Sequence, residues 1–164
     1  MDWHTFLIIT HIIGTVLGVG GATFAEVFYL KAIKDGEIDP TESSFLNTTY
    51  FILRIGIILL VLSGFGLLIL NRLEGSAQYL YSPRLWAKMT LTVIIVVNAV
   101  FLQIRLIPAW LGFSISFTSW YAALILGLWR GASSVGYVTI MLWYVVAVFI
   151  VAFILDRIKK WYVG

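Results

Sequence analysis

The hydrophobic pattern of this chain consists of long apolar runs that are separated by short polar segments. Five runs hold about 17 or more residues with few charged side chains, which is typical of helices that span a lipid bilayer. The predicted spans cover residues 5–30, 50–70, 84–107, 113–129 and 135–155. The pattern therefore predicts an all-α integral membrane protein built as a bundle of five transmembrane helices.

Breaker residues mark the ends of these runs. The segment KDGEIDPTESS, residues 34–44, is the most hydrophilic stretch of the chain, and we expect residues 41–44 to start a short surface helix. Pro83 suits the first turn of the third span, and Pro108 marks the point where that span stops. The fourth span is rich in Ser, Thr and aromatic residues, so we expect it to pack inside the bundle.

Composition supports the membrane class. The chain is 61% hydrophobic and only 12% charged, whereas a soluble domain carries about 25% charged residues. It contains no cysteine, which excludes disulfide bonds and thiolate metal sites. Basic residues gather at the ends of the spans, where they set topology and contact lipid headgroups, so no nucleic-acid partner is expected. The start, MDWHTF, lacks the basic region of a signal peptide, so we expect the first span to be retained.

Basic residues also predict the orientation. If the C-terminus faces the cytoplasm, that side carries Lys31, Lys34, Arg54, Arg105, Arg157, Lys159 and Lys160. The opposite side then carries Arg72, Arg84, Lys88 and Arg130. The positive-inside rule therefore places the N-terminus outside and the C-terminus inside. We expect residues 1–164 to form one domain in the cell membrane (the inner membrane of a prokaryote), in contact with the lipid bilayer.

The first span combines ionisable side chains with small residues. His4 and His11 are seven residues apart and share a helix face, and Gly14, Gly18 and Gly21 follow that face or lie beside it. Small residues let another helix approach closely, and they also let a flat ligand reach the backbone. Helix packing within the chain, a ligand site and a homodimer through this glycine stripe are all compatible with the pattern.

Polar side chains within the spans form two predicted layers. Ionisable residues in a membrane are rare and usually face a bundle interior or a functional site. The outer layer comprises His11, Trp86 and Lys88, with His4 near the surface. We expect His11 and Lys88 to face one cavity.

The inner layer comprises Glu26, Arg54, Gln103 and Arg105. We expect Glu26 to form an ion pair with Arg54 or Arg105. Asn98 lies in the middle of the third span, and we expect it to hydrogen-bond to a neighbouring helix because an unpaired amide is costly in an apolar medium.

The outer layer suits a flat, mostly apolar anion such as haem b or another porphyrin. An imidazole can bind the iron, cations can hold the propionates, and glycines and aromatic rings can face the macrocycle. The candidate site is His11 as metal ligand, surrounded by Gly14, Gly18, Gly21, Trp86 and Lys88. His4 and His11 cannot ligate one iron because they point the same way, about 10 Å apart along one helix. Any haem would then be five-coordinate, or its coordination would be completed by Lys88, by Met89 or by the His11 of a second copy.

Two stretches resemble a known group of membrane proteins. HIIGTVLGVGGATFAEVFYL in the first span and LWAKM in the third are similar to HemJ-type protoporphyrinogen oxidases and CopD-like proteins. The resemblance implies a haem ligand at His11 and an essential lysine at Lys88, the candidate catalytic pair of a haem-dependent membrane oxidoreductase. It covers the first three spans. The third span has Asn98 and Gln103 where that family continues to histidines, and the fifth span lacks its Asn-Glu-x-Pro motif.

Two further functions fit the same residues. A small ion or solute transporter or channel could use a path through Lys88, His11, Asn98, Arg54 and Glu26. Copper is a poor cargo, because the chain offers no cysteine and few methionines as soft ligands. A structural subunit of a membrane complex would need these polar groups only to fix helices against one another.

Overall fold

The described part of the chain contains five long α-helices and the 3-10 helix η1. The computed structural model describes residues 2–32, 38–75, 77–129 and 134–163. The elements are α1 (Trp3–Ala32), α2 (Pro40–Leu73), η1 (Ala77–Tyr81), α3 (Pro83–Gln103), α4 (Ala109–Leu128) and α5 (Tyr137–Val163). All five α-helices contain a stretch that is long and apolar enough to cross a membrane. The predicted all-α bundle of membrane-competent helices is therefore confirmed.

The start of α2 differs from the prediction, and a capping box explains why. The Asp39 side chain accepts a hydrogen bond from the Glu42 amide at 2.7 Å, and the Glu42 side chain accepts one from the Asp39 amide at 3.1 Å. Because this exchange satisfies free amides of the first turn, the helix begins at Pro40 rather than at residue 50. Residues 41–44 belong to α2 and do not form a separate surface helix.

The other helix ends shift by smaller amounts. Helix α3 ends at Gln103 instead of residue 107, and Arg105 takes a left-handed backbone conformation with φ of 55°. Helix α4 begins at Ala109, directly after Pro108, because a proline disfavours helical backbone in the residue before it. Helix α5 continues to Val163, beyond the predicted end at residue 155.

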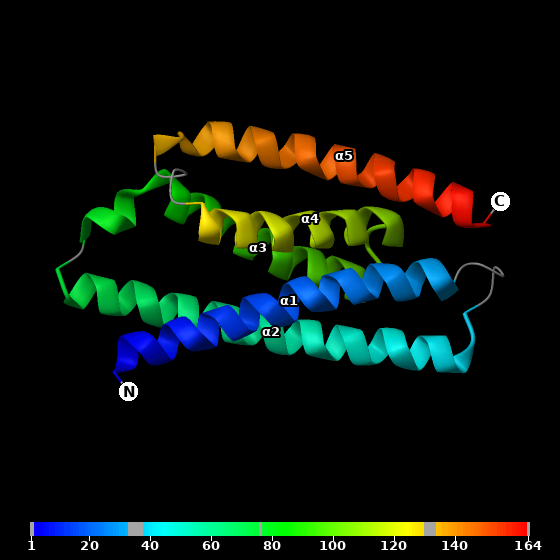
Figure 1. The fold of residues 1–164 in the computed structure, drawn as a ribbon, viewed down its shortest axis with the longest axis horizontal. Coiled ribbons are helices and arrows are strands. Elements are labelled where there is room, and N and C mark those ends of the chain that lie inside the picture. Colours follow the sequence, from blue (N-terminus) through cyan, green and yellow to red (C-terminus); the bar gives the residue numbers. More distant parts are fainter. Residues whose placement is uncertain (1, 33–37, 76, 130–133, 164) are drawn as a thin grey trace.

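Successive helices alternate in direction, and the N- and C-termini lie at opposite ends of the bundle (Figure 1). Helices α1 and α2 pack along each other, whereas α4 contacts α1, α3 and α5. Helices α2 and α3 make few contacts with each other. The protein thus consists of an α1–α2 pair and an α3–α4–α5 group that are joined mainly through α4.

The fourth helix is the most enclosed, as its polar and aromatic composition predicts. In its most apolar 18-residue stretch 39% of the residues are buried, against 11% for α5. Two apolar clusters surround α4. One combines Ala87, Leu91, Leu126, Ile140 and Tyr144, and the other combines Ala22, Leu60, Ile95 and Trp120. The outer faces of the helices carry exposed large apolar side chains, as expected for surfaces in contact with lipid.

Candidate functional site

The glycines of α1 bring two helix backbones into contact. A Cβ added to Gly14 would lie 2.8 Å from the amide nitrogen of Leu60 and 3.0 Å from the carbonyl oxygen of Gly56. A Cβ added to Gly56 would lie 3.0 Å from the amide nitrogen of Gly18. We call Gly14, Gly18 and Gly56 the glycine seam. It joins α1 to α2 at a distance that only glycine permits.

Trp120 of α4 packs against the glycine seam at Gly18. A Cβ added to Gly18 would overlap the Trp120 ring, and this tryptophan is only 1% exposed. Further along α1, Gly21 contacts Leu53 of α2. All three glycines of the predicted ligand wall thus contact the chain's own helices. The stripe therefore serves helix packing within the chain.

The predicted outer layer is centred on a histidine–serine pair. His11 Nδ1 and Ser63 Oγ are 3.0 Å apart, and the Ser63 hydroxyl donates to the Leu59 carbonyl at 2.5 Å. Because a hydroxyl has one hydrogen, and that of Ser63 is given to the Leu59 carbonyl, the pair is consistent with the tautomer in which His11 Nδ1–H donates to the serine oxygen. Lys88 is near enough to interact electrostatically with His11.

The remaining outer-layer residues do not converge on His11. Trp86 is 58% exposed, and His4 is exposed near the start of α1. No group of three His, Asp or Glu side chains that could hold a metal ion occurs among the residues the structure describes. His11 would therefore be the single histidine ligand of any metal held there.

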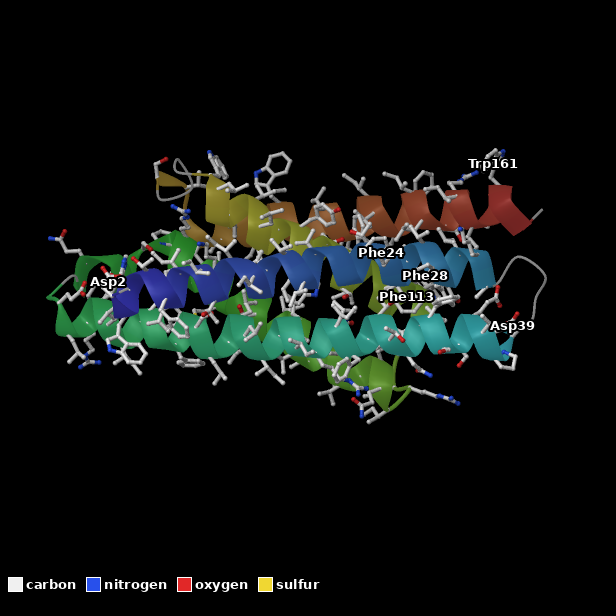
Figure 2. All side chains as sticks on the ribbon, turned by 60° about the horizontal axis from the view of Figure 1, so that its bottom comes forward. Asp2, Phe24, Phe28, Asp39, Phe113 and Trp161 are labelled. Carbon is white, nitrogen blue, oxygen red and sulfur yellow. The ribbon has the colours of Figure 1, made fainter. Side chains whose placement is uncertain are left out.

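The main cavity lies in the other half of the bundle, between α2 and α3. It has a volume of about 830 Å³, with walls from α1 and α4. Its lining includes Ile38 and Ser43, so it extends to the end of the bundle that carries Asp39. Figure 2 shows Phe113, another lining residue, beside the C-terminal part of α1 and far from Asp2. All four predicted inner-layer residues, Glu26, Arg54, Gln103 and Arg105, line this cavity.

The predicted ion pair of Glu26 is wrong. Glu26 is 7% exposed, yet no basic nitrogen of the described residues lies within 4 Å of its carboxylate, and no described hydrogen bond reaches it. Arg54 instead donates from Nη2 to Gln103 Oε1 at 3.5 Å. Both Arg54 and Arg105 are exposed, because long cationic side chains extend toward water while their stems remain on apolar surface.

Asn98 makes the predicted interhelical hydrogen bond. Its Nδ2 donates to the Gly112 carbonyl of α4 at 2.9 Å. Its Oδ1 is buried and, among the described residues, has no hydrogen-bond partner. Asn98 and Glu26 both line the cavity, but the Asn98 oxygen has almost no accessible surface, so Glu26 is the unpartnered acceptor that borders the open space.

Helix α3, which forms one wall of the cavity, is bonded to α4 near both of its ends. Arg84, at the start of α3, donates from Nε to the Leu126 carbonyl at 2.6 Å and from Nη2 to the Gly127 carbonyl at 2.5 Å. These carbonyls belong to the end of α4, which a cation stabilises. Together with Asn98 near the opposite end, Arg84 holds α3 against α4. From the sequence, Arg84 was predicted only to be a topology signal, because nothing in its spacing identifies its partner.

Several apolar wall residues were also absent from the sequence-based site. Tyr50, Phe113 and Trp120 line the cavity, and Tyr50 is near enough to Glu26 for an electrostatic interaction. The aromatic content of the fourth span was the available signal for the last two. Comparison of this chain with protein-family models, with curated proteins and with solved structures finds no match.

Proposed function

We propose that the protein is a small membrane carrier that binds an amphipathic solute in the cavity between α2 and α3. The observation that carries this proposal is the buried, unpartnered carboxyl group of Glu26 in a cavity of about 830 Å³. In a membrane protein, a buried carboxyl group without a cation is costly and usually marks a substrate or proton site. The cavity volume is also within the range of ligand pockets, about 300–1,000 Å³.

The two halves of the bundle support a carrier rather than an open pore. The cavity reaches one end, and toward the other end Trp120 fills the space against Gly18. His11 and Lys88 lie beyond this contact, toward the N-terminal end of α1. A binding site that is open to one side and closed to the other by a packed contact is the starting state of alternating access.

Haem b fits the described residues poorly. The glycines that would face the macrocycle contact Leu60, Trp120 and Leu53, and His11 is not part of the cavity lining. The visible spectrum of the purified protein with added haemin tests this: a haem site would give a Soret band that His11→Ala removes, and we expect no such band.

The carrier proposal is tested by access to the cavity from each side. Because the chain has no cysteine, Ala99→Cys introduces a single thiol into the cavity wall. A membrane-impermeant thiol reagent is then applied to either face of oriented vesicles. Gly20→Cys is the matched control, since nothing lies within 4 Å of a Cβ at that position and it faces away from the cavity.

We expect rapid labelling of Ala99→Cys from the face that carries Asp39 and slower, measurable labelling from the opposite face. Gly20→Cys should react slowly with the reagent from both faces. Labelling from one face alone, whatever the exposure time, would show a static pocket and would reject transport in favour of a binding or structural subunit.

A further inference from the structure

We propose that the solute is a lipophilic primary ammonium ion, that is, an apolar or aromatic body with one –NH₃⁺ group. This inference rests on the proposed function and names the substrate class of the same cavity. It follows from the kinds of polar group that line the cavity, from which of them have partners, and from the apolar walls that surround them.

The first step is the charge of the deepest polar group. Glu26 is buried and has neither an ion-pair nor a hydrogen-bond partner among the described residues. A carboxylate in a low-dielectric site needs a cation or a proton. An ammonium ligand supplies both the charge and the N–H donors, whereas an anionic ligand would add repulsion and satisfy neither oxygen.

The second step is the hydrogen bonding of the Glu26 carboxylate, which no donor of the described residues reaches. Buried polar groups without partners are rare in native proteins and call for an explanation. A primary ammonium carries three N–H donors, so it supplies a hydrogen bond to the carboxylate as well as the opposite charge. A quaternary ammonium has no N–H and supplies the charge alone.

The third step concerns the two arginines of the lining. Arg54 and Arg105 are exposed, and Arg54 is bonded to Gln103. Exposed charges are screened within about 8 Å at physiological salt, whereas buried ones are screened much less. The electrostatic preference of the interior is therefore set by Glu26, and the arginines remain at the rim, where lipid phosphates or water surround them.

The fourth step is the apolar body. Tyr50, Phe113 and Trp120 contribute aromatic surface to the walls, with aliphatic positions between them. Such walls bury an arene or a short alkyl chain, and an aromatic face also attracts a cation. A phenylalkylammonium ion has this combination of a compact apolar body and a single donor-rich head.

The test measures binding of three fluorinated probes to the full-length protein in lipid nanodiscs by fluorine NMR line broadening. The probes share a 4-fluorophenylpropyl body and end in a primary ammonium, a trimethylammonium or a carboxylate group. Empty nanodiscs correct for partitioning into lipid. The variants are Glu26→Gln, which is isosteric and neutral, and Glu74→Gln, a matched control at an exposed glutamate outside the cavity.

We expect saturable binding of the primary ammonium probe, at least tenfold weaker in Glu26→Gln and unchanged in Glu74→Gln. The trimethylammonium probe, which has no N–H donor, should bind the unmodified protein more weakly than the primary ammonium probe. Thermal unfolding of each variant without ligand confirms that it is folded. Equal binding of the carboxylate probe, or unchanged ammonium binding in Glu26→Gln, would overturn the substrate class.

The two proposals fail in different ways. If Ala99→Cys is labelled from both faces while no ammonium probe binds, the proposal of a carrier is supported and the proposed substrate class is wrong. If the ammonium probe binds through Glu26 while Ala99→Cys is labelled from one face only, the proposed ligand class is supported and the proposal of transport is wrong.

Discussion

Helix α2 has two very different neighbours. Toward α1, its Gly56 meets Gly14 and Gly18 so closely that backbone atoms touch. Toward α3, its Tyr50 and Arg54 border a cavity of about 830 Å³. Both faces lie within the same apolar helix, so hydrophobicity alone does not decide between contact and opening. Glycine permits the close contact of α2 with α1. On the other face, α3 is bonded to α4 and makes few contacts with α2.

The largest expected effect comes from filling the glycine seam. Gly14→Val places branched carbon atoms against the backbone of Leu60 and Gly56, which cannot rotate away as a side chain can. Overpacking typically costs about 1–3 kcal/mol and occasionally more, and we expect the upper end here. Unfolding of the protein in mixed micelles, followed by tryptophan fluorescence, measures the loss of stability.

Gly20→Val is the matched control for this prediction. A Cβ at Gly20 meets no atom within 4 Å. The free energy of unfolding of Gly20→Val should therefore stay close to that of the unmodified protein. If Gly14→Val and Gly20→Val unfolded alike, the glycine seam would not be a site of close helix contact.

A smaller effect is expected at the tie between α3 and α4. Arg84→Ala removes two charge-assisted hydrogen bonds to the end of α4. Hydrogen bonds to charged groups contribute about 1.5–3 kcal/mol to stability when fully formed. Because Arg84 is partly exposed, we expect Arg84→Ala to lower the free energy of unfolding by about 2 kcal/mol. Arg84→Lys retains the charge without the forked geometry and should recover part of this loss in the same unfolding assay.

Arg84→Ala should also change the cavity. With α3 released at one end, the approach of α3 to α2 should slow the labelling of Ala99→Cys. Arg72→Ala, at the exposed end of α2, is the control. Unchanged labelling after loss of Arg84 would mean that the separation of α2 and α3 does not depend on this tie.

The smallest effect is expected for the polar pair within the α1–α2 contact. Ser63→Ala removes the acceptor of His11 Nδ1–H, and hydrogen bonds between membrane helices contribute about 0.6 kcal/mol on average. A double-mutant cycle with His11→Ala isolates this coupling from the loss of packing. A coupling energy of zero would show that the two side chains do not share a hydrogen bond in the membrane.

The sequence predicted the number and approximate position of the helices because apolar runs and breaker residues report directly on membrane spans. It also placed Glu26, Arg54, Gln103 and Arg105 in one layer, because depth follows from position along a helix. It did not predict that Trp120 fills the glycine stripe, since periodicity identifies a face and not its partner. The ion pair of Glu26 was wrong for a related reason: two side chains at equal depth can still face different directions.

The length of α2 has a consequence for how a solute would reach the cavity. Its 34 residues extend about 51 Å at 1.5 Å per residue, well beyond a hydrocarbon core of about 30 Å. The capped first turns therefore project among the lipid headgroups, and Ser43 and Asn47 of this projecting part belong to the cavity lining. A solute that has already dissolved in the leaflet could then slide in sideways between α2 and α3. The concentration that governs its binding would be the one within the leaflet, so apparent affinities should rise with the membrane partition coefficient of the probe.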